Sequence, residues 1–114
     1  MPYINVKTNA KLTAEAKEII KRRLFDTIGI LPGKSDRYLM ISIEDKADMS
    51  FHRDSDTPMA IVEVNVFGGA TKDAYQKLCK AICIIMEDDA HVKGDCCYVK
   101  FDEVKYWGYN GFMF

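Results

Sequence analysis

The chain repeats one order of predicted elements, strand then helix then strand, and the second copy follows at an offset of 58 residues, from Thr13 to Thr71. Alternating apolar and polar residues indicate a strand in the first copy, a largely apolar segment indicates one in the second, and apolar residues at helical spacing follow each. Chance similarity between two amphipathic helices is the alternative, but it would not align caps, helix stripes and strands at one offset. The matched pairs are Ile4 and Val62, Val6 and Val64, Ala16 and Ala74, Ile20 and Leu78, and Leu24 and Ile82.

The first copy predicts a strand over residues 3–8, a helix that begins after Thr13 and ends near Gly29, and a largely buried strand over residues 37–43. A threonine before the first helical turn is a typical N-cap, and a glycine with a following proline is a typical helix stop. Residues 45–57 are polar and predict a loop.

The second copy predicts a strand over residues 59–66, a helix over about 71–87 and a strand over 96–101. Two such units with right-handed crossovers give an α+β fold, a four-stranded sheet with two helices on one face. The 114 residues are therefore expected to form a single domain, with pseudo-repeats at about 1–57 and 58–114.

The strands also predict association between subunits. Both the 37–43 and the 59–66 segments are apolar at most positions, so apolar side chains are expected on both faces of the sheet. One layer of helices covers only one face, and an oligomer with inward-facing sheets would cover the other.

Composition excludes several classes of partner. Charges of both signs are interspersed and sum to a net charge of −1, which gives no basic footprint for nucleic acid. No basic leader precedes an apolar run and no apolar window reaches the length of a membrane span, so no membrane association and a cytoplasmic location are expected.

The usual metal, redox and phosphate motifs are absent from the sequence. Cys79, Cys83, Cys96 and Cys97 form no Cys-x-x-Cys or zinc spacing, which favours buried or half-buried thiols over a metal or redox role. Two histidines without defined partners predict surface loops, and no glycine-rich phosphate loop is present. No cofactor is therefore expected.

Pro2 is the residue that most suggests chemistry. Methionine aminopeptidase removes Met1 when a small residue or proline follows, which leaves a secondary amine at the start of the chain. An α-amino group has a pKa of about 7.7 to 8.0, and burial or a nearby cation lowers it. A partly neutral amine can abstract a proton from the carbon next to a carbonyl. Many chains nevertheless carry proline at this position without any such role.

Several motifs accompany Pro2 in a defined order. Gly33-Lys34-Ser35-Asp36-Arg37-Tyr38 precedes the second strand, and Trp107-Gly108-Tyr109-Asn110-Gly111-Phe112 lies near the end. Together with the two β-α-β units, these motifs make the whole chain similar to macrophage migration inhibitory factor and its phenylpyruvate tautomerase relatives. Family members carry a similar Gly-Lys-x-x-x-Tyr, and some end in a similar aromatic run.

This resemblance implies a homotrimer that interconverts keto and enol forms of small aromatic α-keto acids at a site on each subunit boundary. Pro2 matches the catalytic general base of the family. Lys34 matches the lysine that binds the substrate carboxylate and depresses the pKa of the proline, and Tyr38 matches a pocket aromatic. A solvated loop lysine and a strand-filling tyrosine are the alternatives for these two residues.

The resemblance assigns five further substrate-binding positions. Phe67 matches the residue whose backbone N–H contacts the substrate, and Tyr98 matches the tyrosine contributed by a neighbouring subunit. Lys100 stands where animal members often carry asparagine, and a lysine there could supply charge to a carboxylate or an oxyanion. Trp107 and Phe112 match the apolar wall of the C-terminal segment, with Phe114 as the alternative to Phe112.

Two binding functions are the alternatives to catalysis. The first is a cytokine-like signalling protein with a vestigial pocket, released without a signal peptide and recognised by a cell-surface receptor, as some relatives are. The second is a ferredoxin-like domain that senses a small ligand.

Overall fold

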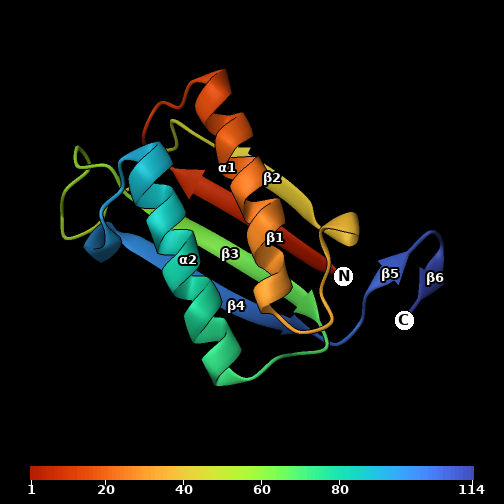
Figure 1. Ribbon diagram of the computed structural model, residues 1–114. Helices are drawn as coiled ribbons and strands as arrows, with labels where there is room; N and C mark the ends of the chain where they lie inside the picture. Colours follow the sequence, from red (N-terminus) through yellow and green to blue (C-terminus); the bar gives the residue numbers. More distant parts are fainter.

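The computed structural model describes all 114 residues and contains a four-stranded mixed sheet with both long helices on one face (Figure 1). The strand order is β2-β1-β3-β4, and the last two strands form a separate hairpin. The predicted α+β architecture is confirmed. The elements are β1 (Pro2–Thr8), α1 (Ala14–Thr27), β2 (Met40–Glu44), β3 (Ala60–Phe67), α2 (Lys72–Ala90), β4 (Cys97–Val104), β5 (Gly108–Tyr109) and β6 (Phe112–Met113).

The sheet is built around an approximate twofold axis. β1 pairs with β3 in antiparallel fashion, β1 with β2 in parallel, and β3 with β4 in parallel. Ile4 lies opposite Val64, and Val6 lies opposite Val62. In the repeat, Ile4 corresponds to Val62 and Val6 to Val64. Ile4 therefore pairs with the counterpart of Val6, and Val6 pairs with the counterpart of Ile4, as a twofold axis between β1 and β3 requires.

The two helices begin in the same way, as the repeat predicts. The Thr13 hydroxyl accepts a hydrogen bond from the Ala16 N–H at 3.0 Å, and the Thr71 hydroxyl accepts one from the Ala74 N–H at 3.1 Å. α2 runs three residues beyond the predicted end and stops at His91, whose φ of 57° is left-handed. Its backbone N–H donates to the carbonyl of Met86, which closes the final turn.

The core lies between the helices and the inner face of the sheet. Ile20 and Leu24 of α1 and Leu78 and Ile82 of α2 are completely buried, each at the position that the repeat matches. Burying a side chain of this size contributes about 1.5 to 3 kcal/mol. The duplicated stripe is thus the main source of packing between helix and sheet.

The strand predicted over residues 37–43 starts later and is less buried than expected. Asp36–Tyr38 form a single 3-10 turn, closed by a hydrogen bond from the Leu39 N–H to the Asp36 carbonyl at 3.2 Å. This turn takes Tyr38 out of the strand. β2 is an edge strand, and its first residue, Met40, is 69% exposed.

The expectation of apolar residues on both sheet faces holds in part, because the open face carries Met40 and Tyr98 as well as polar residues. Residues of β3 alternate strictly between buried and half-buried, and the half-buried set on the open face is Ile61, Glu63, Asn65 and Phe67. Asn5 lies in the centre of the open face, where its amide donates to Glu44 at 2.9 Å and Ser42 donates to its oxygen at 2.5 Å. The open face is therefore mixed, with a polar network around Asn5 and apolar side chains near both ends of the strands.

The aromatic tail folds into the β5–β6 hairpin. Asn110 and Gly111 at its turn have φ angles of 52° and 79°, as a two-residue type I′ turn requires. The hairpin extends beyond the end of the sheet at which the chain starts (Figure 1). No helix in the structure combines the length and apolar character needed to cross a membrane.

Candidate active site

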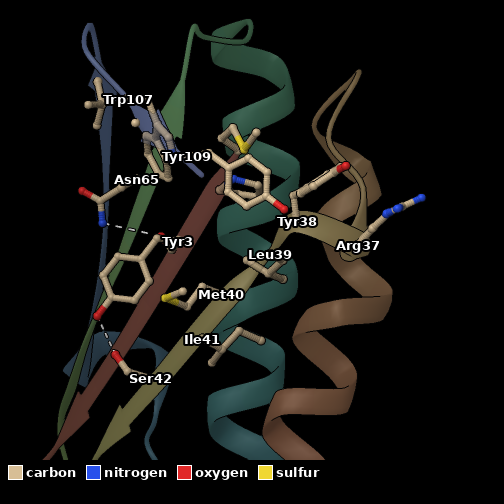
Figure 2. A pocket seen from close by; sticks show the side chains of 14 residues that line it. Tyr3, Arg37, Tyr38, Leu39, Met40, Ile41, Ser42, Asn65, Trp107 and Tyr109 are labelled. Carbon is tan, nitrogen blue, oxygen red and sulfur yellow. Dashed lines mark hydrogen bonds between the residues drawn. The ribbon is translucent and has the colours of Figure 1, made fainter. Parts of the chain in front are cut away.

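A pocket of about 890 Å³ opens at the end of the sheet where β1 begins. Its walls come from β1, β2, the turn before β2 and the start of the hairpin (Figure 2). Nine of its 14 lining residues are apolar, and none is acidic. The lining residues are Met1, Pro2, Tyr3, Arg37, Tyr38, Leu39, Met40, Ile41, Ser42, Asn65, Val104, Trp107, Gly108 and Tyr109.

Pro2 is fixed at the mouth of this pocket by the sheet. It is the first residue of β1, it is buried, and it lies opposite Val66. The carbonyl of Met1 accepts a hydrogen bond from the Phe67 N–H at 3.1 Å, so Met1 occupies part of the pocket. Loss of Met1 would expose the Pro2 nitrogen and free this backbone donor at the same place.

Lys34 lies beside the start of the chain. Its Nζ donates to the carbonyl of Phe67 at 2.8 Å, and it has no acidic partner. Gly68 follows with a φ of 84°, a conformation that glycine adopts without strain, and turns the chain past the lysine. The pKa of the Met1 amino group is lowered, first by burial and second by the positive charge of Lys34.

Aromatic side chains form the far wall of the pocket. The rings of Tyr38 and Tyr109 meet edge to face with centroids 5.7 Å apart, and Trp107 lies near them (Figure 2). Arg37 stands at the rim with its guanidinium 5.5 Å from the Tyr38 ring. Tyr109 belongs to the tail motif, but its position depends on the hairpin turn, which sequence reasoning did not predict.

The polar lining comes from the open face of the sheet. The hydroxyls of Tyr3 and Ser42 are 2.6 Å apart, and the Asn65 amide approaches the Tyr3 carbonyl at 3.5 Å (Figure 2). Sequence reasoning missed these residues because their approach depends on strand register. Alternation along β1 was the only signal that placed Tyr3 on this face.

Two predicted site residues lie away from Pro2 within one chain. Tyr98 stands opposite Ile61 near the other end of the sheet, is 59% exposed, and packs on Phe51 with ring centroids 5.0 Å apart. Lys100 forms ion pairs with Glu63 at 3.6 Å and Asp102 at 3.2 Å, and Asp102 is the main cause of its raised pKa.

Phe112 is also outside the pocket of its own chain. It is 74% exposed on β6. Phe114 instead turns back, where its ring lies 6.1 Å from that of Phe67 and 6.4 Å from that of Tyr109. Within a single chain, the structure thus gathers Pro2, Lys34, Tyr38, Trp107 and the Phe67 backbone.

No group of three or more metal-ligating side chains comes together in the structure. His52 lies in the loop before β3, where its ring stacks on Phe51 with centroids 3.9 Å apart. The chemistry available at the pocket is that of an amine, a lysine, backbone N–H groups and aromatic rings.

A small α+β fold made of two β-α-β units, with the chain start set in an aromatic pocket, defines the class of protein. The chain belongs to the macrophage migration inhibitory factor family, whose family model matches residues 1–114. A search of curated protein sequences found no significant match.

Solved structures of homologues have the same fold. Leishmania major MIF2 matches with a TM-score of 0.92 at 20% identity, covering 100% of this chain and 97% of that one. A homologue from Prochlorococcus marinus matches with a TM-score of 0.88 at 25% identity, covering 98% of each chain. Pt0534 inactivated by 2-oxo-3-pentynoate matches with a TM-score of 0.85 at 16% identity, covering 96% and 93%.

Proposed function

We propose that the protein is a keto–enol tautomerase of phenylpyruvate-like α-keto acids, with Pro2 as its general base once Met1 is removed. The observation that carries the proposal is the placement of the chain start in an aromatic pocket beside an unpaired lysine. Family membership supports tautomerase chemistry of this kind.

Removal of Met1 prepares the site. The new amine on Pro2 lies one residue further into the fold than the amine of Met1, at a buried position. Burial and Lys34 already lower the pKa of the outer amine, and both causes are expected to act on the inner one as well. Both favour the neutral form of the secondary amine, which is the form that accepts a proton.

The proposed reaction moves one proton. The Pro2 nitrogen takes a proton from the carbon next to the carbonyl, the electron pair of that C–H bond forms the enol double bond, the π pair of the carbonyl moves to its oxygen, and the protonated Pro2 delivers the same proton to this oxygen. In the reverse direction Pro2 takes the proton from the enol hydroxyl and returns it to carbon. A general base of this kind typically contributes about 10² to 10⁴-fold in rate.

Binding follows from the groups around Pro2. Lys34 is free of acidic partners, so its ammonium can bind the substrate carboxylate, and the Phe67 N–H released from Met1 can donate to a substrate oxygen. The aryl ring would pack against Tyr38 and Trp107. The absence of acidic residues from the lining favours an anionic substrate.

A homotrimer completes the proposed site. Tyr98 is exposed at the end of the sheet away from Pro2, which supports a role for it in the pocket of a neighbouring subunit rather than in that of its own chain. The tail also leaves several large apolar side chains uncovered, as a contact between subunits would require. These exposed residues are Tyr106, Tyr109, Phe112, Met113 and Phe114.

The solved neighbour Pt0534 adds a chemical parallel, because its structure was determined after inactivation by 2-oxo-3-pentynoate, itself a 2-oxo acid. A compound of this type in the pocket would place its electrophilic alkyne near an amine. Modification of Pro2 by this compound is therefore an expected property of the protein.

The test measures ketonisation of enol-phenylpyruvate at neutral pH by protein whose mass confirms the loss of Met1. Ketonisation should exceed that of a Pro2→Gly variant by at least about tenfold, since glycine keeps the processed terminus but lacks the secondary amine. A second control carries an alanine inserted between Met1 and Pro2. Equal rates in all three proteins would refute the proposal.

A cytokine-like ligand with a secondary pocket is the second candidate. The observation that favours it is the neutralised Lys100, which is held by Glu63 and Asp102 rather than left to bind substrate. On this alternative, binding to a cell-surface receptor should survive Pro2→Gly while turnover is absent from the unmodified protein. Turnover without receptor binding would exclude it.

A further inference from the structure

Three of the four cysteines gather where α2 packs on β4. Cys79 and Cys83 are one helical turn apart on α2, and Cys97 is the first residue of β4. All four thiols of the chain are free and half-buried. Their sequence spacing gives no pairing, because the contact depends on how the helix crosses the strand.

The packing of α2 on β4 sets which thiols meet. α2 runs antiparallel to β4 (Figure 1), and the ring of Tyr75 packs on that of Phe101 with centroids 4.6 Å apart. Eight residues along a helix span about 12 Å, and four residues along a strand span about 13 Å. Cys83 lies eight residues after Tyr75 on the same side of α2, and Cys97 lies four residues before Phe101 on the same face of β4. Because the two steps are nearly equal in length, Cys83 lies opposite Cys97.

The titration of these groups agrees with their closeness. Burial raises the pKa of the Cys97 thiol to about 12, with Cys83 the second cause and Cys79 a further one. The thiols of Cys83 and Cys79 therefore lie near that of Cys97.

We propose that Cys83 and Cys97 are a site of reversible oxidation, at which a small disulfide of the glutathione type installs a cross-link between α2 and β4. The thiolate of Cys83 attacks the small disulfide and releases one small thiol. The second thiolate then attacks the mixed disulfide and releases the other. Two protein thiols are oxidised, one small disulfide is reduced to two thiols, and the two protons pass to these thiols.

The other pairings fit a disulfide less well. Cys79 and Cys83 stand at i and i+4 on one helix, where Cβ atoms are about 5 to 6 Å apart, whereas a disulfide needs about 3.5 to 4.5 Å. Cys96 ends the 3-10 turn Gly94–Cys96 and Cys97 begins β4, and a bond between two sequence neighbours would depart from the usual disulfide geometry. Cys83 and Cys97 come instead from two elements that face each other.

The experiment treats the reduced full-length protein with oxidised glutathione at pH 8, blocks remaining thiols with iodoacetamide and digests with trypsin. Cleavage after Lys77, Lys80, Lys93 and Lys100 separates Cys79 from Cys83 and leaves Cys96 with Cys97. The expected result is two alkylated thiols per chain and a cross-link between peptides 81–93 and 94–100. Dithiothreitol should restore four alkylated thiols.

Matched serine variants assign the bond. Cys79→Ser and Cys96→Ser should keep the cross-link, while Cys83→Ser and Cys97→Ser should lose it. The cross-linked protein should melt about 5 to 10 °C higher than the reduced protein, since the bond constrains the unfolded chain. Four alkylated thiols after oxidation, persistent mixed disulfides only, or a link through Cys79 would overturn the proposal, and the unmutated protein suffices to show each. A link through Cys96 would also overturn it, and the Cys96→Ser and Cys97→Ser variants distinguish that outcome, since both cysteines lie in peptide 94–100.

Discussion

At the scale of single residues, the account rests on Pro2 and Lys34. The sequence identified both, because the second position decides whether the initiator methionine is removed and because Lys34 lies in a motif before the second strand. It could not show that Lys34 is held by the Phe67 carbonyl at 2.8 Å, or that the Phe67 N–H is bound to Met1. These contacts join the turn before β2 to the end of β3, and only the folded sheet brings those segments together.

Lys34→Ala should change both binding and pH dependence. Removal of the positive charge raises the pKa of the neighbouring amine, since that charge now lowers it. The amine acts as a base only when neutral, so the acid limb of kcat/KM should move to higher pH. Loss of a charge-assisted contact should lower kcat/KM by about 10- to 100-fold at the plateau.

The measurement is a pH–rate profile of the processed protein with enol-phenylpyruvate. Lys77→Ala is a matched control, because Lys77 pairs with Asp73 on the exposed side of α2. An acid limb that stays in place in Lys34→Ala would contradict the role of this lysine.

At the scale of elements, the repeat predicts that matching positions in the two copies contribute equally to the free energy of unfolding. Thr13→Ala and Thr71→Ala should each lower the free energy of unfolding by about 1 kcal/mol, since both hydroxyls accept the same capping hydrogen bond. Urea unfolding followed by circular dichroism measures both. Thr13→Ser is the control, because serine keeps a hydroxyl at the cap. A threonine elsewhere, such as Thr57 in the exposed loop, would not serve as a control, because Thr57 is itself hydrogen-bonded to Asp54.

The β5–β6 hairpin should matter for the pocket more than for stability. A chain that ends after Trp107 loses Tyr109, which supports Tyr38, but most of the deleted side chains are exposed. The KM for an aromatic substrate should therefore rise by about tenfold or more, which corresponds to the loss of one aromatic contact of about 0.5 to 1.5 kcal/mol together with its buried area. Steady-state kinetics and a melting curve on the same protein separate the two effects.

Elements that are determined by a few neighbouring residues could be predicted from the sequence, whereas elements that depend on tertiary contacts could not. Helix starts followed from one threonine each, and the inner stripe of α1 and α2 followed from helical spacing. The 3-10 turn at Asp36–Tyr38 and the edge position of β2 did not, because an apolar segment of this length is compatible with a central or an edge strand.

At the scale of the whole molecule, the open face of the sheet is mixed rather than uniformly apolar. The apolar residues along β3 divide between its two faces, since Ile61, Glu63, Asn65 and Phe67 alternate with fully buried valines. Association between subunits is therefore expected to involve the aromatic tail, the strand edges and the apolar side chains of the open face.

Subunit mixing tests whether sites are shared across a boundary. If Tyr98 serves the pocket of a neighbour, a Pro2→Gly protein and a Tyr98→Ala protein should each be weak alone, yet regain part of the activity when unfolded and refolded together. The mixed trimers contain some boundaries with an intact Pro2 and an intact Tyr98. Activity equal to the average of the separate proteins would show that each site lies within one chain.

The central claim is that the Pro2 nitrogen is a neutral base in the pocket at physiological pH. Titration of this nitrogen by ¹⁵N NMR, in protein that has lost Met1, measures it directly. The account predicts a pKa below the ordinary range of about 7.7 to 8.0 for an α-amino group, equal to that of the acid limb of kcat/KM. A pKa at or above the ordinary range, or an acid limb at a different pH, would contradict it.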